Sequence, residues 1–490
     1  MGRKIGIIAS ESTETEARVI LAENEERNVK IEDLVLIKNR CGNLVLAVCR
    51  KGQGVDENLR VSGTYRPSLA YVKRGRTLSN AKQHFNFRLS VIADITEGFT
   101  QNRLIIAPGS EVYAFDPDEN PMEYLSKEIR WDGEIPYIGY YKDRENWKVP
   151  VDPNFIPQHI GIFGVTGCGK SYLAKYCVIP ALLKTGYDIL IFDWKGYDYA
   201  THPKYRDKVL KIGDLHLDND VIVEYLASKM EYFRYSGASA RTSKPYLALT
   251  DIIHDKPWRK HLKNLEEFVS AMEGFCDEVL EEMIEGGEIR KSDAPRYRKQ
   301  FVRGLQRLSE EDIEVIRGEI TPEELLERVR QNHLCVIDMS GGEKETKLSL
   351  FLTIARHLRR LIERKREELN LGLVIDEAPQ YCPYKPSGIE NKTTEMIKDL
   401  CAIGRAYKLC VVLLSQGMAG EIGINAAVRR NINTLFIGRI HPLDRQEAEN
   451  LLGNQGVDID FLTKLPTGHF YFLGSMNPAP VPLLISFKPE

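Results

Sequence analysis

One run of residues in this 490-residue chain has the types and spacing of a phosphate-binding loop. It reads Gly164-Val165-Thr166-Gly167-Cys168-Gly169-Lys170-Ser171, a complete G-x-x-x-x-G-K-[ST] pattern. An apolar stretch before it predicts a buried strand, and the residues after it predict a helix. In such a loop backbone N–H groups surround phosphate oxygens, the lysine contacts the β- and γ-phosphates, and the serine hydroxyl ligates Mg²⁺. The run predicts a nucleoside triphosphate, ATP, as cofactor. The predicted binding residues are Gly164, Thr166, Gly167, Cys168, Gly169, Lys170, Ser171 and Tyr172, with Lys170 also catalytic and Ser171 also a metal ligand.

A second candidate element is an apolar run, 371–375, that ends in the acids Asp376 and Glu377. We expect Asp376 to hold Mg²⁺, usually through water, and Glu377 to polarise the water that attacks the γ-phosphate. Acidic residues after a strand also serve as helix N-caps. A phosphate loop about 200 residues earlier favours the catalytic interpretation.

Two further polar residues end apolar runs. Asp193 follows 189–192, and Gln416 follows 411–415. In a doubly wound sheet the carboxyl ends of the strands face the ligand. We therefore expect both side chains to point at the nucleotide or its attacking water, with Gln416 as a γ-phosphate sensor. The alternative for Asp193 is a cap or turn residue. Asp338 also ends a run, but the turn residues after it explain it equally well.

Arginines near element ends are candidates for a finger that reaches a neighbouring subunit's γ-phosphate. Arg405 is the first choice, followed by Arg429 or Arg430, and Arg439 lies in the same region. A second basic group recurs at helical spacing and predicts either a nucleic-acid-binding helix face or a salt-bridged surface helix beside acidic neighbours. Its members are Arg296, Lys299, Arg303 and Arg307.

Composition indicates an ordinary globular chain with two or three domains. The net charge of −3 excludes a uniformly basic nucleic-acid coat, so any DNA contact requires a local basic surface. The nine cysteines lack C-x-x-C spacing and several lie in apolar runs, which favours reduced core residues. No signal peptide or membrane-length apolar run is recognisable, so we expect a cytoplasmic protein without direct membrane insertion.

The pattern along the chain predicts an α/β fold with additions at two places. Short strands separated by turns over 1–110 predict a small β-barrel, and 111–155 is rich in turn signals and reads as a connector. Apolar runs alternating with helical patterns over 156–215 and 331–476 predict a doubly wound, mainly parallel sheet. Helical periodicity over 216–330 predicts a helical insertion, and 477–490 remains as a C-terminal tail.

Taken together, these motifs resemble the HerA-type hexameric DNA translocases of the HerA/FtsK superfamily. The resemblance rests on the phosphate loop and on five other segments: Gly6 to Thr13, Ile191 to Tyr197, Val336 to Gly341, Ile375 to Pro379, and Gly404 to Gln416. It implies a RecA-like ATPase core with the N-terminal barrel that this family shares with rotary ATP synthase subunits. Departures include Cys168 where serine is more usual and Trp194-Lys195 in the acidic motif.

The resemblance implies a ring, a hexamer in this family, that hydrolyses ATP with Mg²⁺ and translocates double-stranded DNA. It further implies a nuclease partner of the NurA kind docked on the barrel, acting in DNA end resection and repair. One alternative is an ATPase of an antiviral defence complex that scaffolds a nuclease or an NAD-consuming effector. Another is the cytoplasmic motor of a DNA transfer or import machine.

Overall fold

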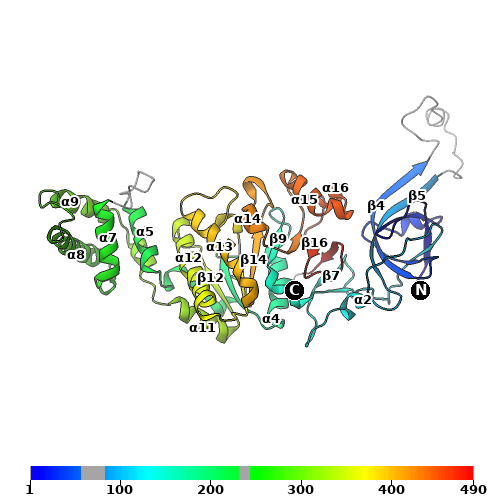
Figure 1. Ribbon diagram of the computed structural model, residues 1–490, viewed down its shortest axis with the longest axis horizontal. Helices are drawn as coiled ribbons and strands as arrows, with labels where there is room; N and C mark the ends of the chain where they lie inside the picture. Colours follow the sequence, from blue (N-terminus) through cyan, green and yellow to red (C-terminus); the bar gives the residue numbers. More distant parts are fainter. Residues whose placement is uncertain (1, 57–82, 231–242, 489–490) are drawn as a thin grey trace, which may run out of the picture. The chain divides into compact units, whose positions relative to one another are not determined.

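The computed structural model describes residues 2–56, 83–230 and 243–488 (Figure 1). The chain forms two compact units. The first unit contains residues 1–185, 414–424 and 432–490, and the second contains 186–413 and 425–431. The phosphate-loop segment belongs to the first unit and the acidic strand end to the second.

The first unit begins with a closed six-stranded barrel, drawn in blue in Figure 1. Its order is β1-β2-β5-β4-β3-β6. The strands are β1 (Lys4–Ile8), β2 (Glu16–Leu21), β3 (Leu34–Lys38), β4 (Leu44–Asp56), β5 (Gln83–Asp94) and β6 (Glu111–Ala114). Side chains such as Val19, Ile37 and Leu89 fill the barrel interior. The closure removes exposed sheet edges, as expected for a small barrel.

The remainder of the first unit is built on a mixed set of strands. They pair in the order β9-β15-β16-β17-β7-β8, with β9 and β15 parallel and the others antiparallel. Their bounds are β7 (Tyr137–Tyr141), β8 (Lys148–Pro150), β9 (Ile160–Phe163), β15 (Thr434–Ile437), β16 (His469–Gly474) and β17 (Leu483–Ser486). The helices are α2 (Met122–Lys127), α3 (Lys170–Leu173), the π-helix η5 (Ala174–Val178), α4 (Ile179–Lys184), α15 (Arg445–Leu451) and α16 (Ile459–Leu462).

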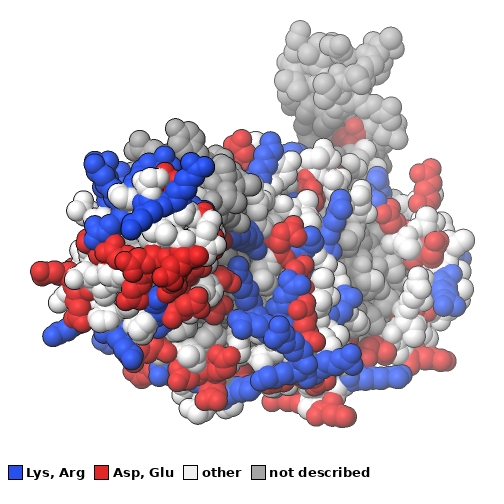
Figure 2. All heavy atoms as spheres, turned by 60° about the vertical axis from the view of Figure 1, so that its left-hand side comes forward, with Lys and Arg blue, Asp and Glu red and all other residues white. Residues whose placement is uncertain are grey.

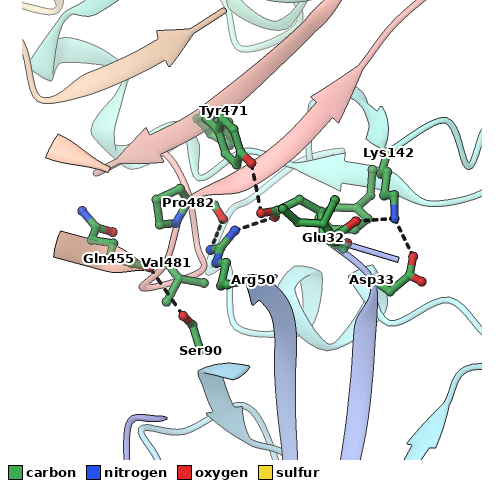
Figure 3. A network of polar contacts seen from close by, with 12 residues as sticks. Glu32, Asp33, Arg50, Ser90, Lys142, Gln455, Tyr471, Val481 and Pro482 are labelled. Carbon is green, nitrogen blue, oxygen red and sulfur yellow. Dashed lines mark hydrogen bonds and ion pairs between the residues drawn. The ribbon is translucent and has the colours of Figure 1, made fainter. Parts of the chain in front are cut away.

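A buried polar network joins the barrel to these strands (Figure 3). The Arg50 guanidinium donates to Glu32 Oε2 at 2.5 Å and to the Pro482 carbonyl at 2.8 Å. Glu32 Oε1 accepts the Tyr471 hydroxyl at 3.0 Å, and the Glu32 carbonyl accepts the Tyr141 hydroxyl at 2.7 Å. Arg50 and Glu32 are both fully buried. Because a buried charge is tolerated only when paired and hydrogen-bonded, the network fixes how the barrel meets β7, β16 and the start of β17.

Two outer contacts extend this network. Lys142 Nζ donates to the Ile31 carbonyl and to Asp33 Oδ1, both at 2.6 Å (Figure 3). Ser90 on β5 reaches the Gln455 carbonyl at 3.5 Å. The barrel is therefore attached by contacts from several separate segments of the chain.

The second unit contains a parallel sheet of order β11-β12-β10-β13-β14. Its strands are β10 (Asp188–Asp193), β11 (Val209–Lys211), β12 (Leu334–Asp338), β13 (Leu371–Ile375) and β14 (Leu409–Ser415). The last two residues of β14 belong to the first unit. The helices between the strands include α12 (Lys344–Arg360), α13 (Ile389–Gly404) and α14 (Ala426–Arg429). β13 and β14 are buried along their whole length, as expected for parallel strands covered on both faces.

Helices make up the described part of the segment between β11 and β12. They are α5 (Asn219–Lys229), α7 (Lys244–Asp255), α8 (Leu265–Glu285), α9 (Ala294–Leu305), α10 (Glu310–Ile316) and α11 (Pro322–Asn332). Asn264 caps α8 through the Glu267 amide, and Thr321 forms a capping box with Glu324 ahead of Pro322 at the first turn of α11. Phe268 and Phe301 are buried in this helical region.

The structure confirms the fold class: a barrel, a doubly wound parallel core and a helical insertion. It differs from the predicted boundaries in three places. β6 extends the barrel to Ala114, and the predicted connector 111–155 also supplies β7 and β8 to the sheet. The predicted tail 477–490 contains β17, which pairs with β16 and β7. These pairings are long-range, so the local turn signals did not reveal them.

Candidate nucleotide-binding site

The predicted phosphate loop connects β9 to a continuous helical run, α3 to α4, in the first unit. Gly164, Gly167 and Gly169 all have positive φ angles, of 153°, 77° and 105°. A Cβ at Gly164 would come within 2.7 Å of the Cys168 sulfur. At Gly164 both the backbone conformation and the available space favour glycine, and at Gly167 and Gly169 the backbone conformation alone does.

Lys170 lies at the start of the helix with its ammonium turned back into the loop. Nζ donates to the carbonyls of Gly164 at 2.9 Å and Val165 at 3.3 Å. Phosphate oxygens of a bound nucleotide would offer this ammonium a stronger, charged acceptor than these neutral carbonyls. Ser171 beside it is half-buried and Tyr172 is exposed. The structure thus places Lys170 and Ser171 where the motif predicts them.

Gln416 lies beside the loop. Its Oε1 accepts the Thr166 hydroxyl at 3.1 Å, and the Gly164 amide donates to the Ser415 carbonyl at 3.2 Å. The buried carboxylate of Asp444 holds the segment that follows by accepting the amides of Met418 and Ala419. The end of β14 is thereby fixed next to the phosphate loop, which is the position that a γ-phosphate sensor needs.

The other side of the loop is supported from the segment that leads into β16. The Thr467 hydroxyl donates to the Gly167 carbonyl at 3.0 Å, and the Gly468 amide donates to the Cys168 carbonyl at 2.9 Å. The Val165 amide donates to the Arg439 carbonyl at 2.8 Å. Cys168 is buried, and burial raises the pKa of its thiol. Its sulfur therefore acts as a small apolar filler of the loop.

In the second unit, acidic residues end neighbouring parallel strands. Asp193 pairs in register with Asp338, and the Asp376 amide donates to the Phe192 carbonyl. Asp376 is 4% exposed, and its Oδ2 has no hydrogen-bond partner. Burial, followed by the negative charges of neighbouring acids, raises the pKa of Asp376 to about 8. A divalent cation would supply the missing partner and offset these charges, so Asp376 fits the predicted magnesium ligand.

Glu377 has a left-handed backbone, with φ 51° and ψ 48°, which is uncommon for a residue with a side chain. Its Oε1 forms an ion pair with Lys195 Nζ at 2.5 Å. Strained backbone conformations concentrate at functional sites, where the surroundings maintain them. The conformation and the ion pair together set the direction of the Glu377 carboxylate.

Asp193 is fully buried, and its carboxylate accepts the amides of Gly196 at 3.0 Å, Tyr199 at 2.8 Å and Ala200 at 3.0 Å. These contacts match the alternative interpretation, in which Asp193 organises the turn after β10. Its catalytic role stays a prediction.

The candidate arginines occupy different places. Arg405 is exposed in the short turn between α13 and β14, at the amino edge of the second unit's sheet. β13 separates this edge from Asp376 by about 17 Å, at 3.3 Å per strand residue. The trans role of Arg405 stays a prediction. Arg429 is half-buried and Arg430 exposed on α14. The backbone of Arg439, in contrast, contacts the phosphate loop of its own chain, where its carbonyl accepts the Val165 amide.

Comparison with known families identifies the central part of the chain. Residues 136–358 match the family model described as the central domain of helicase HerA. This segment of the chain is similar to a HerA central domain.

The HerA match agrees with a full-length relative. The chain is 22% identical to the DNA double-strand break repair helicase HerA of Pyrococcus furiosus over 494 aligned residues, which covers 90% of this chain and 84% of that protein. The HerA-matched range contains the phosphate loop and Lys195 and ends within α12, before Asp376, Glu377 and Gln416.

Two solved structures are similar at low sequence identity. VirB4 of Thermoanaerobacter pseudethanolicus is 16% identical with a TM-score of 0.49, covering 74% of this chain and 98% of that one. The plasmid coupling protein TrwB in complex with ADP and Mg²⁺ is also 16% identical with a TM-score of 0.49, covering 76% and 93%.

Three side chains that contact or support the candidate site residues were not singled out by sequence reasoning. Lys195 follows a predicted strand end and appeared only as a departure from the family pattern. Thr467 and Asp444 lie in segments without a motif. Thr467 contacts a residue 300 positions away in the sequence, and Asp444 accepts an amide 25 positions away. No local sequence signal marks such contacts.

Proposed function

We propose that this chain is a ring-forming, ATP-dependent translocase of double-stranded DNA that works with a nuclease partner. The observation that carries the proposal is the match to the HerA central domain over a segment whose phosphate loop has the glycine conformations and the lysine placement of a nucleotide site. The named relative is a DNA repair helicase, which supports DNA as the substrate of the motor.

The proposed hydrolysis assigns a role to each of five residues. Lys170 binds the β- and γ-phosphates, Ser171 and Asp376 hold Mg²⁺, and Gln416 senses the γ-phosphate next to Thr166. When bound, Mg²⁺ would neutralise the negative charge that develops during phosphoryl transfer. Glu377 accepts a proton from the attacking water or orients that water.

Helix α9 supplies a local basic surface that suits a nucleic-acid backbone. Arg296, Lys299 and Arg303 are exposed on it, whereas Arg298 is paired with Asp277 of α8. Glu310, one of the acidic residues that follow α9, accepts the Leu265 amide. Figure 2 turns this part of the chain forward and shows Lys and Arg side chains gathered beside a band of Asp and Glu. Phosphate contacts from such a surface would make DNA binding strongly salt-dependent.

The assembly and the partner are the finer parts of the proposal. The exposed position of Arg405 supports a ring in which each nucleotide is completed by a neighbouring subunit. The barrel is the proposed docking site for the nuclease, and a cytoplasmic location is proposed with it. In the described residues no helix has both the length and the apolar character needed to cross a bilayer.

Steady-state ATP hydrolysis with and without linear duplex DNA tests the proposal, at two salt concentrations and with Glu377→Gln as control. We expect DNA to stimulate hydrolysis, less so at the higher salt, and the variant to be inactive. A rate that ignores DNA even with the candidate partner present would favour the effector scaffold over the motor. Full-rate hydrolysis by Glu377→Gln would remove the role assigned to Glu377.

A further inference from the structure

Lys195 is the cation whose ammonium contacts the carboxylate of Glu377. The two side chains meet at 2.5 Å, with Lys195 38% and Glu377 14% exposed. They come from the ends of adjacent parallel strands, β10 and β13, whose register pairs Phe192 with Ile375. The ion pair therefore connects the first residues of two loops that leave the same edge of the sheet.

The backbone on both sides of Lys195 is anchored. On one side the Trp194 ring packs against Tyr381 at 5.1 Å, and Lys347 Nζ donates to the Trp194 carbonyl at 3.0 Å. On the other side Gly196 has φ 73°, and a Cβ there would lie 2.1 Å from Asp338 Oδ1. A lysine on a mobile surface loop loses its orientation through side-chain and backbone freedom. Here the backbone of Lys195 is held on both sides, so its side chain starts from a fixed position.

The acidic residues around Glu377 indicate what the ion pair with Lys195 does. Asp198, Glu377 and Asp193 place negative charge close to the buried Asp376. Burial alone would lower the pKa of Lys195, but the ion pair with Glu377 raises it overall, so the ammonium stays charged. The ammonium of Lys195 therefore gives the Glu377 carboxylate a charged hydrogen-bond donor in a fixed place among these acids.

We propose that Lys195 is a positioning residue for ATP hydrolysis, which holds the Glu377 carboxylate in the orientation that activates the attacking water. The proposal rests on the proposed role of Glu377. Lys195 itself touches neither nucleotide nor water in this assignment. Residues that orient a reacting group typically contribute 10- to 100-fold to activity, as the partners of metal-bound side chains do.

The test compares Lys195→Met with Lys195→Arg in DNA-free ATP hydrolysis. We expect Lys195→Met to lower kcat about 10- to 100-fold while the KM for ATP changes less than about twofold, because nucleotide binding does not use this side chain. Lys195→Arg keeps the charge and should recover most of the rate.

A matched control is Lys344→Met. Lys344 forms an ion pair with Glu390 in the same unit, with 42% and 15% exposure of the two side chains. We expect its kcat to equal that of the unmodified chain, which separates loss of any surface ion pair from loss of this one.

Three results would overturn the proposal: an unchanged or raised kcat in Lys195→Met, a loss carried by KM, or no recovery by Lys195→Arg. These measurements need no DNA. A chain that hydrolyses ATP without responding to DNA would therefore refute the motor and leave the test of Lys195 intact. A chain that hydrolyses no ATP would refute both.

Discussion

The ion pair between Arg50 and Glu32 allows a stability prediction with a definite magnitude. Both side chains are fully buried where the barrel meets the neighbouring strands (Figure 3). Replacing Arg50 by Met retains much of the apolar volume of its stem. The change removes the donors to Glu32 Oε2 and to the Pro482 carbonyl. Glu32 then keeps the Tyr471 hydroxyl as a donor to its other oxygen, but no opposite charge.

Breaking one partner of a buried ion pair typically destabilises a protein by about 3–5 kcal/mol, because the remaining charge stays buried without compensation. For a folded body of roughly 150–250 residues, each kcal/mol lowers the melting temperature by about 2–4 °C. We therefore expect Arg50→Met to lower the melting temperature of the transition that includes the barrel by roughly 6–20 °C. Replacing Glu32 with Gln in the same chain should return part of this loss, since no buried charge then remains.

The assay is calorimetry of the full chain, with the single and double variants compared. Arg88→Met is the matched control, because Arg88 pairs with Glu16 on the same barrel but both side chains are 44% exposed. An exposed pair contributes about 0–1 kcal/mol, so this control should barely move the transition. The reasoning is refuted if the melting temperature of Arg50→Met lies within about 2 °C of that of the control, or if the double variant loses the sum of the single losses.

Three further predictions concern other regions. Gln416→Ala should lower kcat for ATP hydrolysis about 10-fold or more with nucleotide binding retained, because the side chain next to Thr166 is proposed to act on the γ-phosphate. Lys299→Glu combined with Arg303→Glu on α9 should weaken duplex binding and flatten its salt dependence by about two counterions, measured by fluorescence anisotropy across salt concentrations. Acidification should destabilise the second unit through His216, whose pKa is lowered first by burial and then by Arg259.

The sign of the pH effect follows from proton binding. His216 in the unfolded chain takes up a proton near its ordinary pKa of 6.5, whereas the folded chain resists it to lower pH. Stability is therefore full above about pH 7 and falls as the pH drops below 6.5. Melting curves at several pH values check this, and His216→Gln should show a shallower fall. An equal fall in the variant would assign the effect elsewhere.

The other two predictions have their own contradicting outcomes. Unchanged kcat in Gln416→Ala would leave its hydrogen bond to Thr166 as a structural contact of the loop. The α9 variant should be compared with Arg298→Ala, since Arg298 is already engaged by Asp277. Equal effects of the two changes would argue against a specific role of the exposed α9 face.

The sequence predicted the parallel strands of the core well because each is a continuous apolar run. The apolar run 371–375 coincides with β13, and the runs 189–192 and 411–415 lie within β10 and β14. Burial on both faces imposes this pattern locally, so no tertiary information is needed. β17 was missed for the opposite reason. It is four residues long, Leu483–Ser486, and exists through its pairing with β16 and β7, which the local pattern does not encode.

The same distinction applies to the candidate site. Motif spacing placed Lys170 correctly at the loop because glycine conformations and a helix start are local properties. The partners of a carboxylate at a strand end are not local. Asp193 and Asp376 have the same sequence context, an apolar run ending in an acid. Three backbone amides nevertheless occupy Asp193, while Asp376 keeps an oxygen without a partner.

This contrast decides which acid can serve a cation. A carboxylate that already accepts three amides has its charge compensated. If it bound a metal ion instead, those amides would lose their acceptor. Asp376 has no such loss, and its raised pKa shows that the protein alone does not compensate its charge. Because the turn that Asp193 organises also carries Lys195, the two acids have complementary tasks. In the proposed mechanism, Asp193 builds the loop that carries Lys195, and Asp376 remains available for Mg²⁺.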